Sequence, residues 1–169
     1  MGGGLDIARR ARAAVAGVAM AWAGVGHAAV PPVLAQAISR GAHIFHHDSF
    51  GSRVHPVSDA AQAFADMDGG HAQTRFMTCD VCHGHGGLTR GRLADGRRIP
   101  SLRNAAAVFP RYSAKSHRIV TLEDQIRHCV IDGIKGRPPA YPGATMVDLV
   151  SYLKSLAAGQ RMAIGGAFH

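Results

Sequence analysis

The sequence has few cysteines, few aromatic side chains and no long hydrophobic stretch. Two of its three cysteines, Cys79 and Cys82, form a C-x-x-C pair, while the third, Cys129, stands alone. A zinc-binding domain usually needs a second such pair, and a thioredoxin-like redox site usually lies in a strand–helix–strand pattern, which is not visible around this pair. The cysteine spacing therefore argues against a zinc site and against a thiol–disulfide oxidoreductase.

Aromatic residues make up 6% of the chain, and no stripe of aromatic and basic residues occurs. The formal net charge is +8, but the arginines are scattered along the sequence, so the charge does not single out nucleic acid as a partner. An excess of positive charge favours an acidic protein partner or a small anionic substrate through long-range steering. We therefore expect no binding of nucleic acid.

The most apolar run, residues 13–26, is shorter than the roughly 20 residues that span a bilayer. Three arginines at positions 9–12 precede it, and small residues at 26–29 follow it, which is typical of a cleavable signal peptide. We therefore expect residues 1–29 to be a signal peptide. The mature protein would then be periplasmic or otherwise exported, without stable membrane insertion after cleavage of the signal.

The motif with the clearest chemistry is Cys79-Asp80-Val81-Cys82-His83, a C-x-x-C-H run. This spacing is typical of a c-type haem attachment site, in which the two thiols form thioether bonds to the porphyrin. The imidazole of His83 is then placed to be the proximal ligand of the iron. The sequence therefore predicts one covalently bound haem c, which would also fill a core that has few large side chains.

Apolar residues recur at helical spacing in three stretches. Val33–Phe45 is predicted to be an amphipathic helix, and Gly41 within it indicates the close approach of another backbone. Thr121, followed by acidic residues, predicts the start of a second helix on which Cys129 faces the core. A final helix is expected from Thr145 to Ala157.

These elements predict one all-α domain over residues 30–160. Residues 48–74 are rich in turn formers and are expected to be an insertion before the motif, with one candidate helix from Asp59 to Met67. Residues 161–169 are expected to form a flexible tail.

The order of helix, C-x-x-C-H motif, long loop, helix and C-terminal helix resembles that of class I cytochrome c domains, which are all-α folds wrapped around one covalently bound haem. From Cys79 onward, the chain is also similar to the thiosulfate dehydrogenases and to the haem-binding subunits of sulfur-oxidising cytochromes. The blocks that carry this similarity are Phe109-Pro110-Arg111-Tyr112, Thr121-Leu122-Glu123-Asp124-Gln125-Ile126-Arg127-His128-Cys129, Gly136-Arg137-Pro138-Pro139 and Met146-Val147-Asp148-Leu149-Val150-Ser151-Tyr152-Leu153.

The resemblance implies that Cys129 is the distal ligand of the haem iron, opposite His83. Met146 is the alternative, because a methionine in the last third of the chain is the usual distal ligand of electron-carrying cytochromes c. A methionine on the core face of a helix can equally be there to fill space. If the chain is itself an enzyme, the resemblance makes Cys129 and Lys115 its candidate catalytic residues.

The chain departs from the pattern of these relatives at three points. It has Gln125 where they carry a basic residue and Gly133 where they carry a serine, and it has one haem motif where the dehydrogenases usually carry two.

These features favour an exported monohaem c-type cytochrome for one-electron transfer, acting as a carrier or subunit in the oxidation of inorganic sulfur compounds. Its partner would be a redox protein, such as another cytochrome subunit. Two alternatives stay open. One is a thiosulfate dehydrogenase-like enzyme that acts on a small anionic sulfur compound at a cysteine-ligated haem, and the other is a haem protein that binds a small ligand such as nitric oxide.

Overall fold

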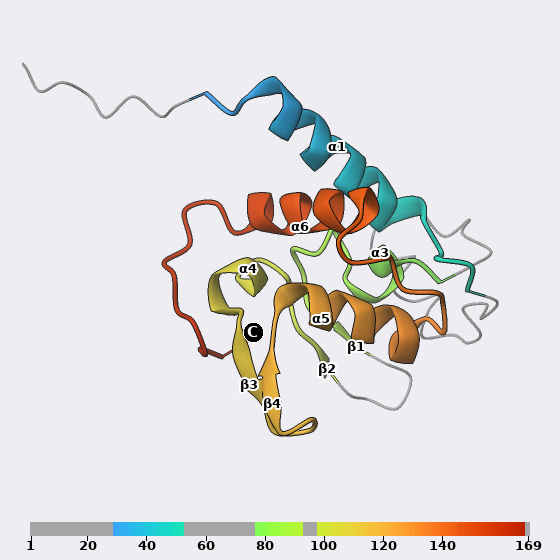
Figure 1. Ribbon diagram of the computed structural model, residues 1–169, viewed down its shortest axis with the longest axis vertical. Coiled ribbons are helices and arrows are strands. Elements are labelled where there is room, and N and C mark those ends of the chain that lie inside the picture. Colours follow the sequence, from blue (N-terminus) through green and yellow to red (C-terminus); the bar gives the residue numbers. More distant parts are fainter. Residues whose placement is uncertain (1–28, 53–76, 93–97, 168–169) are drawn as a thin grey trace, which may run out of the picture.

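The computed structural model describes residues 29–52, 77–92 and 98–167 (Figure 1). The expected signal peptide, apart from its last residue, the expected helix from Asp59 to Met67 and most of the expected insertion lie outside the described residues. In order along the chain, the elements are α1 (Pro32–His47), α3 (Cys79–Cys82), β1 (Gly91–Arg92), β2 (Arg98–Ile99), α4 (Ala105–Val108), β3 (Arg111–Ser113), β4 (Arg118–Val120), α5 (Leu122–His128), the π-helical segment η1 (Cys129–Gly133) and α6 (Ala144–Leu156).

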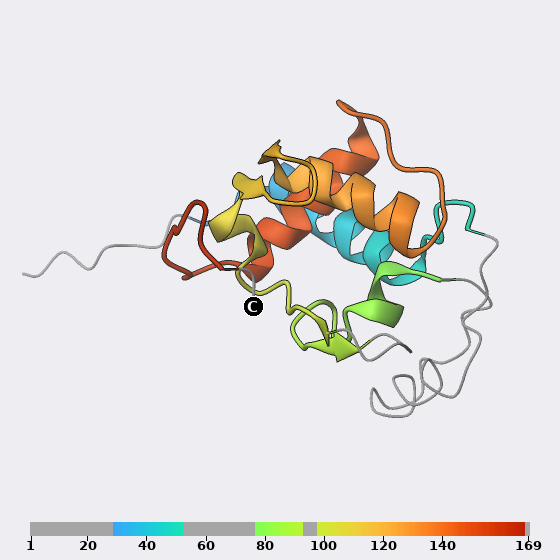
Figure 2. The same ribbon diagram turned by 90° about the horizontal axis from the view of Figure 1, so that it is seen from below.

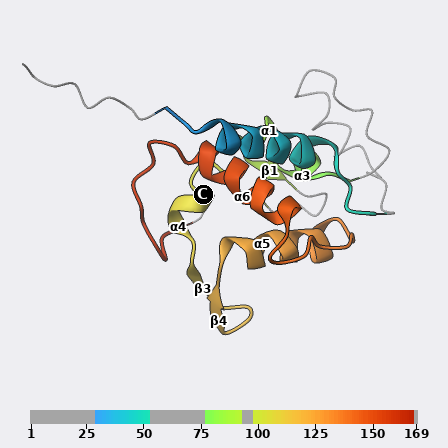
Figure 3. The same cartoon turned by 45° about the horizontal axis from the view of Figure 1, so that its top comes forward.

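Helix α1 crosses α6, and this is the most extensive contact between elements of the described structure (Figure 3). Gly41 is buried at the crossing, where an added Cβ atom would overlap the backbone carbonyl of Asp148. The prediction that another backbone approaches Gly41 is thus confirmed. One turn further along, Phe45 is 2% exposed, and its ring centroid lies 5.4 Å from that of Tyr152.

The first turn of α1 differs from the expected amphipathic pattern. Val33 and Leu34, which helical spacing places on the apolar face, are 72% and 41% exposed. The reason is the angle between the helices, because α1 rises away from α6 towards its N-terminal end (Figure 1).

A bidentate ion pair reinforces the crossing. Arg40 donates from Nε and Nη2 to the two carboxylate oxygens of Asp148, at 2.8 and 2.9 Å. The Asp148 side chain is 7% exposed and that of Arg40 is 57% exposed. Arg40, which stays in contact with solvent, thus neutralises the buried carboxylate of Asp148. An unpaired charge at that buried position would destabilise the fold.

A capping box fixes the start of α5. The side chain of Thr121 accepts from the backbone N–H of Asp124, and the Asp124 carboxylate accepts from the backbone N–H of Thr121, each at 3.2 Å. Arg118 adds an ion pair to Asp124 at 2.8 Å, and these hydrogen bonds lower the pKa of that carboxyl. The predicted helix start at Thr121 is therefore confirmed.

The same helix widens at its C-terminal end. The N–H of Ile134 donates to the carbonyl of Cys129 at 3.2 Å, which is the five-residue spacing of a π-helix. Beyond it, the N–H of Arg137 donates to the carbonyl of Phe50 at 2.7 Å, and the hydroxyl of Ser52 donates to the carbonyl of Ile134. The segment after η1 is thus tied to the chain that follows α1.

The described fold is rich in helix, with two antiparallel ladders of two strands each. Gly91 pairs with Ile99 in the first ladder, and Arg111 pairs with Val120 in the second. An all-α interpretation is correct for the core but omits both ladders, because strands of two or three residues leave no periodic signal. Figure 2 shows α1, α5 and α6 on one side of the molecule and α3 with β1 and β2 on the other.

The C-terminal segment is attached to the rest of the fold through its backbone. The backbone N–H groups of Ala163 and Gly165 donate to the carbonyls of Ala107 and Val108 in α4, each at 2.9 Å. Part of the segment expected to be a flexible tail is therefore hydrogen-bonded to α4.

Among the described residues, no helix has both the length and the apolar character needed to cross a membrane.

Replacing Gly41 by alanine should destabilise the protein, even though alanine is favoured over glycine by about 1 kcal/mol in a helix interior. The added methyl group collides with a backbone carbonyl that can move only if α6 shifts. We expect a loss of roughly 1–3 kcal/mol in the free energy of unfolding, measured by urea denaturation. Ser39→Ala is the control, since Ser39 is an exposed residue of the same helix. Equal stability of the two variants would contradict the prediction.

Candidate haem site between α3 and α5

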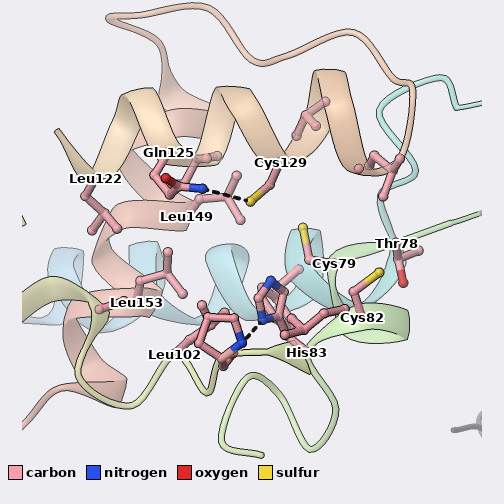
Figure 4. A pocket seen from close by; sticks show the side chains of 18 of the residues that line it. Thr78, Cys79, Cys82, His83, Leu102, Leu122, Gln125, Cys129, Leu149 and Leu153 are labelled. Atoms are coloured by element: carbon pink, nitrogen blue, oxygen red, sulfur yellow. Dashed lines mark hydrogen bonds between the residues drawn. The ribbon is translucent and has the colours of Figure 1, made fainter. Parts of the chain in front are cut away.

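The C-x-x-C-H motif forms the short helix α3 and the residue that follows it. Cys79 and Cys82 are the first and last residues of α3, and the backbone N–H of His83 donates to the carbonyl of Cys79 at 3.0 Å. This single turn brings all three side chains to one cavity (Figure 4). Together with the lining residues of 98–102, they form what we call the proximal wall.

The ring of His83 is held in one orientation. Its Nδ1 atom lies 3.1 Å from the carbonyl oxygen of Pro100. A carbonyl can only accept, so Nδ1 must carry the proton, and Nε2 is left with a free lone pair. Burial also lowers the pKa of His83, which favours the neutral imidazole. This is the tautomer and the orientation that a metal-ligating histidine requires.

The loop after His83 is fastened to both long helices. The Asp80 carboxylate accepts from the backbone N–H of Gly86 at 3.0 Å and pairs with Nδ1 of His46, on α1, at 2.9 Å. The Tyr152 hydroxyl, on α6, donates to the carbonyl of Gly86 at 2.7 Å. Gly86 has a φ of +64°, and an added Cβ would press against that hydroxyl. The position of His83 is thus fixed by contacts with α1 and α6.

The opposite side of the cavity, which we call the distal wall, consists of its lining residues on α5 and η1: Leu122, Gln125, Ile126, Cys129, Val130 and Gly133. Cys129 is an exposed residue, but its sulfur points into the cavity, towards Cys79 on the proximal wall (Figure 4). Gln125 Nε2 donates to Cys129 Sγ over 3.5 Å. Burial raises the pKa of the Cys129 thiol, and the hydrogen bond from Gln125 opposes that effect.

The two motif cysteines have little thiolate character in this environment. Burial raises the pKa of Cys82 to about 11 and that of Cys79 still further. In the part of the chain that the structure describes, no group of three or more His, Cys, Asp or Glu side chains is arranged to hold a metal ion.

The cavity between the two walls has the size and the lining of a site for an apolar organic group. Its volume is about 330 Å³, within the range of about 300–1,000 Å³ usual for sites that hold organic ligands. Its lining is mainly aliphatic and aromatic, with contributions from α1, α4, α5 and α6. The apolar members are Phe45, Ile99, Pro100, Leu102, Ala105, Phe109, Leu122, Ile126, Val130, Ile134, Leu149 and Leu153. A porphyrin attached at α3 would contact both walls.

One lining residue carries an unsatisfied polar atom. Thr78, directly before the motif, has a buried hydroxyl without a hydrogen-bond partner among the described residues. A buried hydroxyl without a hydrogen-bond partner is uncommon in a packed protein core. It is consistent with a cavity whose full set of contacts includes a bound cofactor.

Two residues singled out from the sequence lie elsewhere. Met146 is 1% exposed, belongs to the core cluster and is not among the lining residues. Lys115 lies on the turn between β3 and β4, where its Nζ is 3.6 Å from Oδ2 of Asp132, and it does not line the cavity either. The structure thus brings Cys79, Cys82, His83 and Cys129 together and leaves these two outside.

The sequence did not reveal the groups that hold the site in place. Asp80 occupies a motif position where any residue satisfies the spacing, and His46 lies far away along the chain. The carbonyl of Pro100 carries no side-chain signal at all. The sequence indicates Gln125 as a departure from the pattern of the relatives, whereas its contact with the Cys129 sulfur comes from the structure.

Comparisons with known proteins indicate the family and the fold of the chain. Residues 60–162 match the model of the SoxA/TsdA cytochrome c domain. No match was found among curated proteins. Among solved structures, the thiosulfate dehydrogenase TsdBA from Marichromatium purpuratum, in its as-isolated form, is similar with a TM-score of 0.50 and 23% sequence identity. That alignment covers 80% of this chain and 25% of the other chain. The similarity therefore concerns the fold alone, and this chain corresponds to about a quarter of the length of the dehydrogenase chain.

A cytochrome c domain implies covalently bound haem c, and cytochromes of the SoxA/TsdA type are typically periplasmic. The family model covers more than half of the chain and includes the whole C-x-x-C-H motif and Cys129. The protein therefore belongs to the SoxA/TsdA cytochrome c family.

Proposed function

We propose that the protein is an exported monohaem c-type cytochrome that transfers single electrons in the oxidation of inorganic sulfur compounds. The observation that carries the proposal is the shared cavity, in which a C-x-x-C-H motif on one wall faces a single cysteine on the other. Family membership supports haem-based electron transfer in sulfur oxidation.

On the proximal wall, Cys79 and Cys82 would hold the porphyrin through two thioether bonds. His83 would be the proximal ligand, with its free Nε2 lone pair set by the contact with Pro100. Bound haem supplies an iron atom that cycles between the ferric and ferrous states. The apolar lining would restrict the access of water to that iron, and burial of this kind is one of the protein's means of setting a reduction potential.

On the distal wall, Cys129 would be the sixth ligand. It lines the cavity opposite His83, whereas Met146 is packed in the core and does not line it. Cys129 also begins η1, and π-helical turns are frequently found at functional sites. These placements favour Cys129 over Met146.

The distal wall favours electron transfer over oxidation of thiosulfate by this chain alone. None of its described lining residues is cationic, and Gln125 contributes a neutral amide. Lys115, the basic residue that an enzyme would use, points to Asp132 instead. The one cationic residue among the described lining residues, Arg98, belongs to the proximal wall. A divalent anion next to Cys129 would therefore have no cation beside it on the distal wall, where such chemistry requires charge stabilisation. The net charge stays positive after removal of residues 1–29, which carry three arginines and one aspartate, and it suits an acidic redox partner such as another cytochrome subunit.

Covalent attachment is the first test. The mature protein should weigh one haem more than its polypeptide, and its band should stay coloured on a denaturing gel. Replacing both Cys79 and Cys82 by alanine should abolish that colour, whereas Cys129→Ser should keep it, because the distal cysteine forms no thioether. A colourless wild-type band, with zinc found by elemental analysis, would overturn the assignment.

The distal ligand is tested by the reduction potential. A thiolate stabilises ferric iron and methionine raises the potential, so Cys129→Met should raise it markedly. Cys129→Gly should allow exogenous imidazole to bind to the iron. Met146→Leu is the control, since it preserves apolar volume in the core. If Met146→Leu changes the spectrum and potential while the Cys129 variants do not, Met146 is the ligand.

Because the described lining residues of the distal wall include no cation, we expect this chain to oxidise thiosulfate slowly. With thiosulfate and an artificial one-electron acceptor, the purified chain should stay below the roughly 1 to 1,000 per second that is typical of enzymes. Its haem should nevertheless be oxidised and reduced rapidly by small redox mediators. Turnover within the enzymatic range would show that the chain is a thiosulfate dehydrogenase in its own right.

A further inference from the structure

The amide of Gln125 is directed at the sulfur that would ligate the iron. Its Nε2 atom lies 3.5 Å from Cys129 Sγ (Figure 4). Among the described residues, no other hydrogen bond reaches this sulfur. A metal-bound thiolate can only accept hydrogen bonds, so the amide must present its NH₂ group rather than its oxygen.

The backbone joins the same two residues. The N–H of Cys129 is shared between the carbonyls of Gln125 and Ile126, at the point where α5 passes into η1. This fixes the position of Cys129 relative to the preceding turn. Gln125 therefore contacts Cys129 through both its carbonyl and its side chain, and the geometry of the hydrogen bond depends on where the π-helical segment begins.

The surroundings of the sulfur make this contact the dominant polar one. Leu122, Ile126 and Val130 on the distal wall are apolar. The neutral amide is thus the main group of this wall that can withdraw electron density from the sulfur.

We propose that Gln125 is a positioning residue that sets the reduction potential of the haem and the lability of its distal ligand through the hydrogen bond to Cys129 Sγ. This inference rests on the proposed function, in which Cys129 ligates the iron. A hydrogen bond to a thiolate reduces its electron donation to the metal. It therefore stabilises the ferrous state relative to the ferric state and weakens the iron–sulfur bond.

The test compares Gln125→Leu with the wild type, as haem-loaded protein. Leucine removes the NH₂ donor without adding a charge. A neutral hydrogen bond contributes about 1 kcal/mol, which is about a fivefold change in an equilibrium constant. The potential should therefore fall by about 40 mV for this one-electron couple. The equilibrium constant for displacement of the ligand by imidazole should fall about fivefold.

Gln125→Arg supplies a charged donor and should shift both quantities in the opposite direction, since charge-assisted hydrogen bonds are stronger. Gln36→Leu is the matched control, because Gln36 is exposed on α1 and does not line the cavity. It should leave both the potential and the imidazole affinity unchanged.

The decisive comparison repeats Gln125→Leu in the Cys129→Met background. The inference expects the shift in potential to disappear there, because the thiolate acceptor is gone. A shift of equal size in both backgrounds would overturn the role of the hydrogen bond. If Gln125→Leu has no effect while Cys129→Met does, the inference fails and the proposed ligation stands. If neither change affects the potential, the ligation by Cys129 fails, and the inference fails with it.

Discussion

The close crossing of α1 and α6 is the contact on which the cavity depends. Gly41 allows the two backbones to touch, and the pair between Arg40 and Asp148 holds them at that distance. Both helices then contribute to the lining, through Phe45 of α1 and Leu149 and Leu153 of α6. A wider separation of the helices would move these side chains apart and change the shape of the space that the haem is proposed to fill.

Most of the architecture that surrounds this crossing could be predicted from the sequence. Gly41 indicated the close contact, Thr121 and its acidic neighbours indicated a helix start, and the observed bounds of α6 differ from the expected ones by one residue at each end. These successes share a cause. Helix periodicity and capping are local properties, so a single sequence contains the information that they need.

The parts that escaped prediction depend on contacts between distant residues. The side-chain bond from His46 to Asp80 joins α1 to the motif, and neither residue type indicates the other. The π-helical widening at Cys129 and the exposure of Val33 likewise follow from packing angles, which a periodic pattern does not encode. The motif could therefore be identified from its spacing, whereas the groups that orient it required the structure.

The fastening of the loop after His83 has a consequence for electron transfer. Asp80 and Tyr152 hold this loop through Gly86, and Pro100 holds the imidazole itself, so the proximal side has little freedom to rearrange when the iron changes its charge. On the distal side, the one side-chain hydrogen bond to Cys129 among the described residues comes from Gln125. If Cys129 is the ligand, as proposed, the nuclear reorganisation that accompanies each transfer should be concentrated in the iron–sulfur bond, and the stiffness of that bond should govern how fast electrons enter and leave.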